Sequence, residues 1–175
     1  MTSEFLNPEK TLNEIEIQQD MIAADFGCGS GGWVLPLAKI LEDGKIYAVD
    51  VLEEPLSALR SKADSQGFSN IETILSDIEN SSKISDESCD LILITNLLFE
   101  VEDKEAVLKE AKKVLKSEGE ILVVDWKKQA GGFGPQKQER ISADQVKKIA
   151  EQLDLKLKKE FDAGGYHYAL LFQKS

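Results

Sequence analysis

Residues 21–50, MIAADFGCGSGGWVLPLAKILEDGKIYAVD, carry the strongest structural signal in this sequence. Residues 21–27 form a short apolar run that predicts a buried β-strand, and the glycines that follow predict a tight turn. Apolar residues then recur at the spacing of one helix face, at Val34, Leu37, Ala38 and Leu41. Gly44 ends this pattern, and residues 45–50 form a second run rich in β-forming residues. The order predicts a strand, a glycine-rich loop, a helix and a second strand.

The same alternation continues along the chain. A helix is predicted between Pro55 and Gly67, because proline favours a helix start and glycine a helix end. Two apolar runs, residues 71–75 and 89–95, predict a third and a fourth strand, and the polar residues 79–87 predict a surface connection between them. The next helical stripe consists of Val107, Leu108, Ala111, Val114 and Leu115.

A fifth strand is predicted at residues 121–124, and Ser117-Glu118-Gly119 is expected to separate it from the preceding helix. Strands that are apolar on both faces and alternate with amphipathic helices are typical of a parallel sheet covered on both sides. The predicted fold class is therefore α/β, with an open, doubly wound sheet.

The pattern changes in the last third of the chain. Residues 131–135 are rich in glycine and predict a loop, and Ser142 with Gln145 predicts a capping box at the start of a helix. Two strands follow, at residues 155–161 and 166–172, with only four residues between them. A parallel crossover needs a much longer connection, so the two strands are predicted to form an antiparallel hairpin.

Composition limits the classes of partner. The chain has 175 residues, 32 acidic against 21 basic side chains, and a formal charge of −11. Such a charge repels a phosphate backbone or an anionic membrane, so neither nucleic acid nor a membrane is an expected partner. Cys28 and Cys89 show no metal-ligand spacing, so no metal site or disulfide is expected. The chain begins without a basic and apolar leader pattern, and a cytoplasmic location is expected.

The residues suited to bind a ligand follow the ends of the predicted strands. The loop Gly27-Cys28-Gly29-Ser30-Gly31 precedes a helix, where free backbone N–H groups favour a negatively charged group. Asp50 and Asp77 end the second and third strands, and Thr95-Asn96 ends the fourth. The carboxyl ends of parallel strands meet at one edge of a sheet, where nucleotide-type ligands bind. The alternatives are a purely structural glycine turn and aspartates that act as helix caps.

These segments together resemble one family. The run Ala24-Asp25-Phe26-Gly27-Cys28-Gly29-Ser30-Gly31, followed by Tyr47-Ala48-Val49-Asp50, by Ser76-Asp77 and by Cys89-Asp90-Leu91-Ile92-Leu93, resembles the class I S-adenosylmethionine-dependent methyltransferases. The resemblance covers about residues 21–126. It implies a seven-stranded sheet in which the last strand is antiparallel and lies beside the fifth.

The resemblance also implies roles for individual residues. The glycines of the loop would pass along the methionine part of S-adenosylmethionine, with Asp25 orienting the loop. Asp50 would bind the ribose hydroxyls, Asp77 the adenine amino group, and Leu52 and Ile78 the adenine faces. Thr95 and Asn96 would lie beside the transferring methyl group. The expected cofactor-binding set is Asp25, Gly27, Cys28, Gly29, Ser30, Gly31, Asp50, Val51, Leu52, Ser76, Asp77, Ile78, Thr95 and Asn96.

Methyl transfer from a sulfonium requires an aligned, desolvated acceptor and needs neither a metal nor a covalent residue. Candidate catalytic residues are Asn96 and His167, the only histidine, which could act as a base with an ionisation near pH 6 to 7. The alternative for His167 is a packed strand residue. The expected acceptor is a small molecule or a protein, because the motifs of adenine, glutamine and pyrimidine methyltransferases are absent.

Two other functions stay open at this point: a cofactor-binding regulatory subunit without activity of its own, and a nicotinamide-dependent oxidoreductase. One domain is expected over residues 1–175, and the oligomeric state is undetermined. Its expected parts are a helical cap that begins at Asn7-Pro8 (1–20), a cofactor-binding core (21–126), a loop that acts as a lid (127–141), and a helix with the C-terminal hairpin (142–175).

Overall fold

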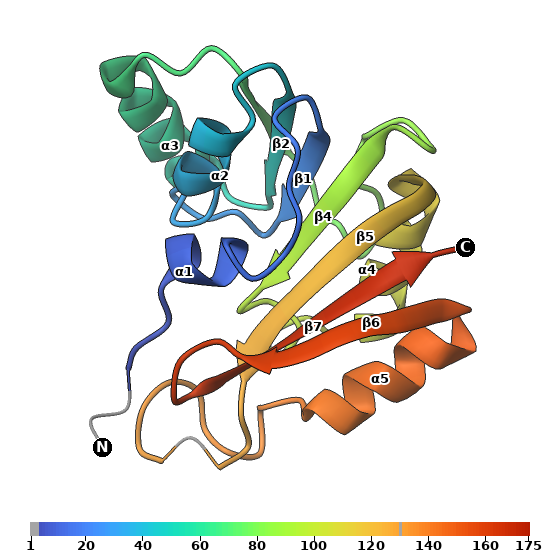
Figure 1. Ribbon diagram of the computed structural model, residues 1–175. Helices are drawn as coiled ribbons and strands as arrows, with labels where there is room; N and C mark the ends of the chain where they lie inside the picture. Colours follow the sequence, from blue (N-terminus) through green and yellow to red (C-terminus); the bar gives the residue numbers. More distant parts are fainter. Residues whose placement is uncertain (1–3, 130) are drawn as a thin grey trace.

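A seven-stranded sheet forms the centre of this computed structural model, which describes residues 4–129 and 131–175 (Figure 1). Its strands are β1 (Ile22–Phe26), β2 (Lys45–Asp50), β3 (Ile71–Leu75), β4 (Cys89–Thr95), β5 (Leu115–Trp126), β6 (Leu155–Asp162) and β7 (His167–Lys174). Their order across the sheet is β3-β2-β1-β4-β5-β7-β6. Strands β1 to β5 are parallel, and β7 pairs antiparallel with both β5 and β6. The predicted fold class and the place of the last strand are confirmed.

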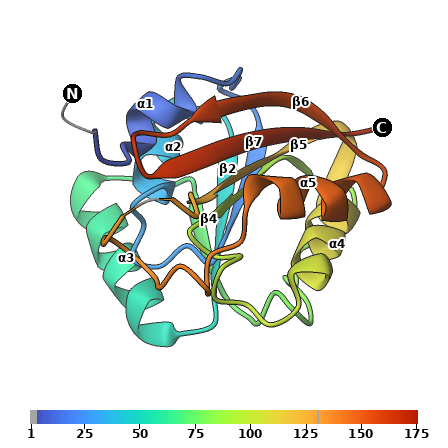
Figure 2. The ribbon, with the colours of Figure 1, turned by 90° about the horizontal axis from the view of Figure 1, so that it is seen from below.

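Helices cover both faces of the sheet (Figures 1 and 2). They are α1 (Pro8–Leu12), α2 (Val34–Ile40), α3 (Glu53–Gln66), α4 (Lys104–Val114) and α5 (Ala143–Gln152). One core cluster joins the sheet to α1, α2 and α3, and the other joins it to α4 and α5. Successive side chains of a strand point to opposite faces, so Leu93 packs in the first cluster and Ile94 in the second. Burial on both faces explains why the central strands β1 and β4 are almost entirely apolar, whereas the edge strand β6 is largely charged and exposed.

The predicted helix boundaries have specific partners. The side chain of Asn7 accepts a hydrogen bond from the backbone N–H of Lys10 (3.1 Å) and caps α1. Ser142 and Gln145 form the complete capping box at α5. Gly67 ends α3 with a φ of 76°, a left-handed conformation that glycine adopts without strain. These local signals therefore acted as their sequence patterns predicted.

The expected break before the fifth strand is wrong. Strand β5 runs without interruption from Leu115 to Trp126 and absorbs the extra residues in a bulge. Leu115 pairs with Cys89, whereas Glu120 pairs with Leu91, so the registers differ on the two sides of the bulge. Glu118 takes a φ of 66° within it. Leu115 pairs with β4 before the bulge, and from Glu120 onward the strand pairs with both β4 and β7, so the pairing that flanks the bulge keeps the strand continuous where its local sequence favours a turn.

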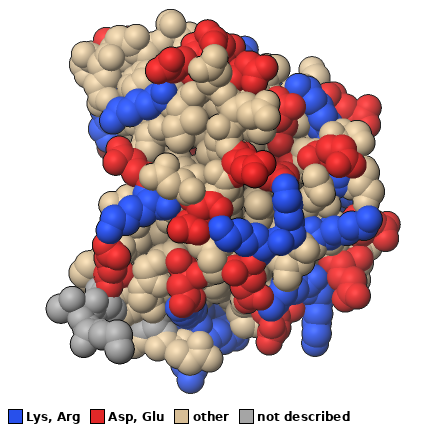
Figure 3. Space-filling view, viewed as in Figure 1, with Lys and Arg blue, Asp and Glu red and all other residues tan. Residues whose placement is uncertain are grey.

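The sheet topology brings several polar segments to one edge. Strands β1 to β4 are parallel, so their carboxyl ends lie at the same edge, and β7 starts there because it runs in the opposite direction. On the face shown in Figure 3, Lys and Arg side chains alternate with Asp and Glu and form no continuous basic stripe. Among the described helices, none is long and apolar enough to cross a membrane.

Candidate functional site

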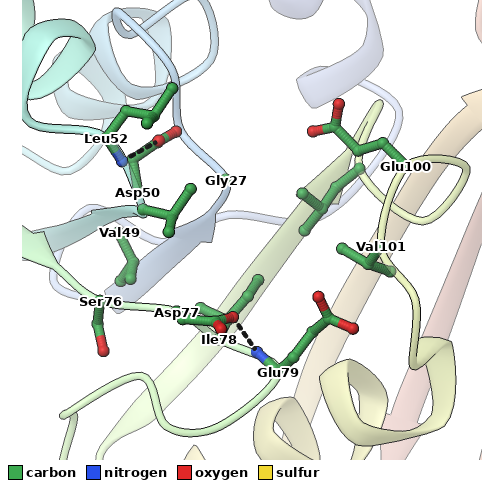
Figure 4. Close-up of a pocket in the computed structure, with 12 residues that line it drawn as sticks. Gly27, Val49, Asp50, Leu52, Ser76, Asp77, Ile78, Glu79, Glu100 and Val101 are labelled. Carbon is green, nitrogen blue, oxygen red and sulfur yellow. Dashed lines mark hydrogen bonds between the residues drawn. The ribbon is translucent and has the colours of Figure 1, made fainter.

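A pocket of about 370 Å³ lies at the carboxyl edge of β1, β2 and β3 (Figure 4). Its walls come from the ends of these strands and from the segment that follows β4. The lining residues are Gly27, Val49, Asp50, Val51, Leu52, Ser76, Asp77, Ile78, Glu79, Leu97, Glu100 and Val101. Seven of them belong to the predicted cofactor-binding set: Gly27, Asp50, Val51, Leu52, Ser76, Asp77 and Ile78.

The glycine loop folds over the end of β2. The backbone N–H groups of Gly27 and Cys28 both donate to the carbonyl of Val49, at 2.8 and 2.9 Å. Gly27 has a φ of 71°, and a Cβ atom there would lie 2.7 Å from the Leu97 side chain. Gly29 has a φ of 54° and an unfilled space where a Cβ atom would stand. The loop thus needs glycine for its backbone shape and leaves room for a ligand to approach.

Asp50 connects this loop to the pocket wall. One carboxylate oxygen accepts the N–H of Gly29 (2.9 Å) and the other accepts the N–H of Leu52 (3.0 Å). Helix α3 begins at Glu53 with Leu52 as its N-cap residue, so the alternative in which Asp50 caps that helix is wrong. An ionised carboxylate has further lone pairs, which remain available to a hydroxyl ligand.

Asp77 has a local role as well as a place in the pocket. Its carboxylate accepts the N–H of Glu79 (3.0 Å) and the side-chain amide of Asn80 (2.8 Å). These bonds stabilise the turn after β3. The next helix, α4, begins only at Lys104, so the alternative in which Asp77 caps a helix is also wrong. Ile78, on the same turn, is buried and lines the pocket.

Asp25 lies beneath the loop, inside β1. Its side chain is fully buried, and neither carboxylate oxygen has a hydrogen-bond partner among the described residues. Burial, and next the nearby Asp50, raise the pKa of Asp25 well above its usual value. The structure therefore shows no direct hydrogen bond through which Asp25 would orient the loop.

The other predicted residues lie outside the lining of this pocket. Cys28, Gly29, Ser30 and Gly31 continue the loop beside it, and burial raises the pKa of the Cys28 thiol, which keeps it protonated. Thr95 and Asn96 are at the end of β4, adjacent to the lining residue Leu97. Asn96 has a φ of 50°, and its buried side-chain oxygen has no partner among the described residues.

His167 lies farther along the same edge, at the start of β7. Its ring packs against Trp126 with 4.1 Å between ring centroids, and it is only 4% exposed. Strands β4 and β5 separate β7 from β1, which corresponds to roughly 14 Å at the usual strand spacing. Burial, and next Lys127, lower the pKa of His167 to about 4. The ionisation expected near pH 6 to 7 is therefore wrong for the folded protein.

Sequence reasoning missed five lining residues: Val49, Glu79, Leu97, Glu100 and Val101. Three of them follow β4, where the chain turns back across the pocket. Figure 4 shows Glu100 on the wall opposite Asp50. Burial, and next Asp50, raise the pKa of Glu100 above its usual value. The three residues after β4 lie close behind a predicted strand end, which was the available signal in the sequence, but they belong to no recognisable motif.

Comparison with known proteins agrees with this geometry. A family model described as a methyltransferase domain matches residues 17–165, which include the glycine loop and every residue that lines the pocket. The chain belongs to this family. The methyltransferase is 30% identical over 118 residues to demethylmenaquinone methyltransferase from Bacillus subtilis (strain 168), an alignment that covers 67% of this chain and 50% of the relative.

The corresponding protein of Geobacillus stearothermophilus is 29% identical over 109 residues, which are 62% of this chain and 46% of that one. The methyltransferase thus spans about half the length of these relatives. Among solved structures, a SAM dependent methyltransferase from Aquifex aeolicus superposes with a TM-score of 0.90 at 29% identity, over 97% of this chain and 90% of that chain.

The [4+2]-cyclase SpnF superposes with a TM-score of 0.83 at 16% identity, over 95% of this chain and 79% of that chain, which shows the shared fold alone. The family match and the Aquifex structure establish this protein as a class I S-adenosylmethionine-dependent methyltransferase, as the resemblance implied. They support neither the regulatory nor the nicotinamide alternative.

Proposed function

We propose that the 370 Å³ pocket holds S-adenosylmethionine and that the methyl group passes to a small aromatic acceptor bound at the adjoining edge of the sheet. The observation that carries the cofactor assignment is Asp50, a carboxylate that faces the pocket while it holds the N–H of Gly29. The assignment uses the full cofactor-binding set predicted from the sequence, extended by the lining residues Leu97, Glu100 and Val101.

The residues present fit this cofactor. Asp50 accepts hydrogen bonds from a ribose diol, and Asp77 accepts one from an adenine amino group. Ile78 and Leu97 provide apolar surfaces for the two faces of the base. The space beside Gly29 accommodates the amino acid part, next to the free polar atoms of the buried Asp25.

When bound, the cofactor supplies an activated methyl group on a sulfonium. The chain's own contribution is to align the acceptor and exclude water. Asn96, at the end of β4, orients an acceptor through its unpartnered side-chain oxygen. His167 is neutral at physiological pH because of its low pKa, so one of its two ring nitrogens can accept a hydrogen bond or a proton from an acceptor hydroxyl, while the other carries an N–H.

Aromatic rings near His167 support a planar acceptor. Phe5, Phe133 and Tyr166 come from three separate segments, and their ring centroids lie 5.2 to 5.8 Å apart. Phe5 and Phe133 are 64% and 53% exposed. The Bacillus subtilis relative is named for a quinone acceptor, and the same class of ring compound suits this surface.

The loop 127–141 covers this acceptor side and is proposed to act as its lid. Gly134 lies so close to Trp126 that a Cβ atom would stand 2.7 Å from the indole ring. The indole in turn packs on His167. Movement of this loop would expose both side chains to an acceptor.

Calorimetry and turnover test the proposal. Titration of S-adenosylhomocysteine is expected to give saturable binding, whereas NAD gives no heat. With S-adenosylmethionine and 1,4-dihydroxynaphthalene, kept reduced, the isolated chain is expected to form a methylated product. His167→Gln is expected to lower this rate about 100-fold with cofactor affinity unchanged. Cofactor binding without turnover on any hydroquinone or phenol would favour a regulatory subunit, and wild-type turnover in His167→Gln would return that residue to a packing role.

A further inference from the structure

Glu100 differs from the other acidic side chains of the cofactor pocket. Asp50, Asp77 and Glu79 each accept at least one backbone N–H, from Gly29, from Glu79 and from Asp103 respectively. The carboxylate of Glu100 makes no hydrogen bond or ion pair with the residues that the structure describes. Glu100 is an exposed residue of the pocket wall, so its carboxylate is solvated and, unlike the other three, is free to pair with a cationic ligand that enters the pocket.

The backbone holds this side chain in place. Glu100 lies in the turn after β4, and its N–H donates to the carbonyl of Leu97 (3.0 Å). The preceding N–H, that of Phe99, is directed at the buried carboxylate of Asp125 (3.4 Å). From this turn the side chain extends toward the side of the pocket on which Gly27 and Asp50 lie (Figure 4).

The pocket as a whole is negative. Four carboxylates line it, from Asp50, Asp77, Glu79 and Glu100, and no Lys or Arg is among its described lining residues. A cleft lined by one sign of charge concentrates the opposite sign. The pocket therefore favours a ligand that is cationic over one of the same shape that is neutral.

The methyl donor and the product that remains after methyl transfer differ in charge at the sulfur atom. S-adenosylmethionine has a positive sulfonium one carbon away from the ribose. Loss of the methyl group leaves the C–S electron pair on sulfur, and S-adenosylhomocysteine has a neutral thioether there. With the ribose on Asp50, as proposed, the sulfur bonded to its 5′ carbon would lie in the same pocket, which Glu100 lines from the wall opposite Asp50.

We propose that Glu100 is a specificity residue that binds the sulfonium by charge and thereby favours the methyl donor over its demethylated product. The inference rests on the proposed cofactor site and goes beyond it, because ribose and adenine contacts are the same in both ligands. Glu100 would limit product inhibition: the attraction ends when the sulfur becomes neutral, so the product leaves more readily.

Binding of three ligands tests this without turnover. Calorimetry compares S-adenosylmethionine, S-adenosylhomocysteine and sinefungin, whose ammonium group replaces the methylated sulfur. In Glu100→Gln, the dissociation constants of the two cationic ligands are expected to rise roughly two- to fivefold, the upper part of the range for an exposed ion pair, and that of S-adenosylhomocysteine less than twofold. Glu102→Gln is the matched control, because Glu102 is exposed, lies outside the pocket lining and carries the same charge.

Salt gives a second readout. The preference of the wild type for S-adenosylmethionine over S-adenosylhomocysteine is expected to shrink between about 0.02 and 0.5 M NaCl, and to shrink less in Glu100→Gln, where only the carboxylates of Asp50, Asp77 and Glu79 remain. Equal weakening of all three ligands, or no change in any, in a Glu100→Gln protein with wild-type melting behaviour would overturn the inference and leave the cofactor site intact. Failure of the wild type to bind any of the three would instead overturn the proposed function.

Discussion

Asp50 joins two tasks in one side chain, because it holds the glycine loop through Gly29 and faces the pocket. Asp50→Ala removes the carboxylate that is proposed to bind the ribose, together with its hydrogen bond to the loop. We expect a loss of about 1.5–3 kcal/mol in S-adenosylhomocysteine binding, or roughly 10- to 150-fold in affinity, measured by calorimetry. Asp43→Ala, in an exposed turn, is the control and should bind normally. An Asp50→Ala protein with unchanged affinity would place the ribose elsewhere.

His167 predicts a specific dependence of stability on pH. Its pKa is about 4 in the folded protein against a usual value of 6.5, so between these values the unfolded chain binds a proton that the folded chain does not. Its contribution to the free energy of unfolding therefore falls as the pH drops from about 6.5 to 4, by at most about 3 kcal/mol.

Asp125 has the opposite effect on the free energy of unfolding as the pH drops. Burial raises its pKa from 3.8 to about 6, so the folded protein binds the extra proton and gains stability as the pH drops through this range. Denaturant unfolding of wild type and His167→Gln at pH 7 and pH 4.5 separates the two effects. The variant is expected to lose less stability on acidification than the wild type. Parallel losses in both proteins would show that His167 is not buried in its neutral form.

At the scale of elements, Arg140 organises the loop 127–141. Its side chain is 4% exposed, and its guanidinium donates to five backbone carbonyls, those of Lys127, Lys128, Gly131, Phe133 and Pro135. The glycines of the loop alone predict free movement, whereas this arrangement fastens most of the loop to one side chain. The proposed lid is therefore expected to move as a unit about its ends.

Arg140→Lys retains the charge and loses the planar fork of donors. Several backbone carbonyls of the loop then lose this donor, at about 1–3 kcal/mol each where water does not replace it. We expect faster tryptic cleavage at Lys127, Lys128 or Lys137 in the variant, followed by mass spectrometry. In the wild type, S-adenosylhomocysteine together with 1,4-dihydroxynaphthalene is expected to slow the cleavage. Equal rates with and without these ligands would contradict the proposed lid.

The pocket is built from the ends of three strands and the turn that follows a fourth, so at the scale of the whole molecule its ligand is expected to stabilise the entire fold. A ligand at 100 times its dissociation constant adds about 2.7 kcal/mol to the free energy of unfolding. For a domain of this size, that raises the melting temperature by roughly 5–10 °C. Differential scanning calorimetry with S-adenosylhomocysteine measures the shift, and NAD at the same concentration is the control. An equal shift with NAD would argue against the cofactor assignment.

Periodic burial explains how much of the architecture was predictable. Strands buried on both faces must be apolar throughout, and helices buried on one face must repeat every three to four residues, so both patterns are visible in residues 21–50. Caps such as Ser142 with Gln145 act within one turn of chain and were also predictable. The bulge at Glu118 was not, because pairing with β4 and β7 overrode the local preference for a turn.

For the site, Gly27, Asp50, Asp77 and Ile78 could be predicted because parallel strands bring their carboxyl ends together. Properties that depend on contacts with residues distant in sequence could not be predicted. The low pKa of His167 results from burial beside Trp126, and the place of Glu100 opposite Asp50 results from the return of the chain after β4. The amino-acid sequence alone determines which residues follow the ends of the strands. Burial and the proximity of residues distant in sequence arise only in the folded chain, so the pKa of His167 and the position of Glu100 depended on the tertiary structure.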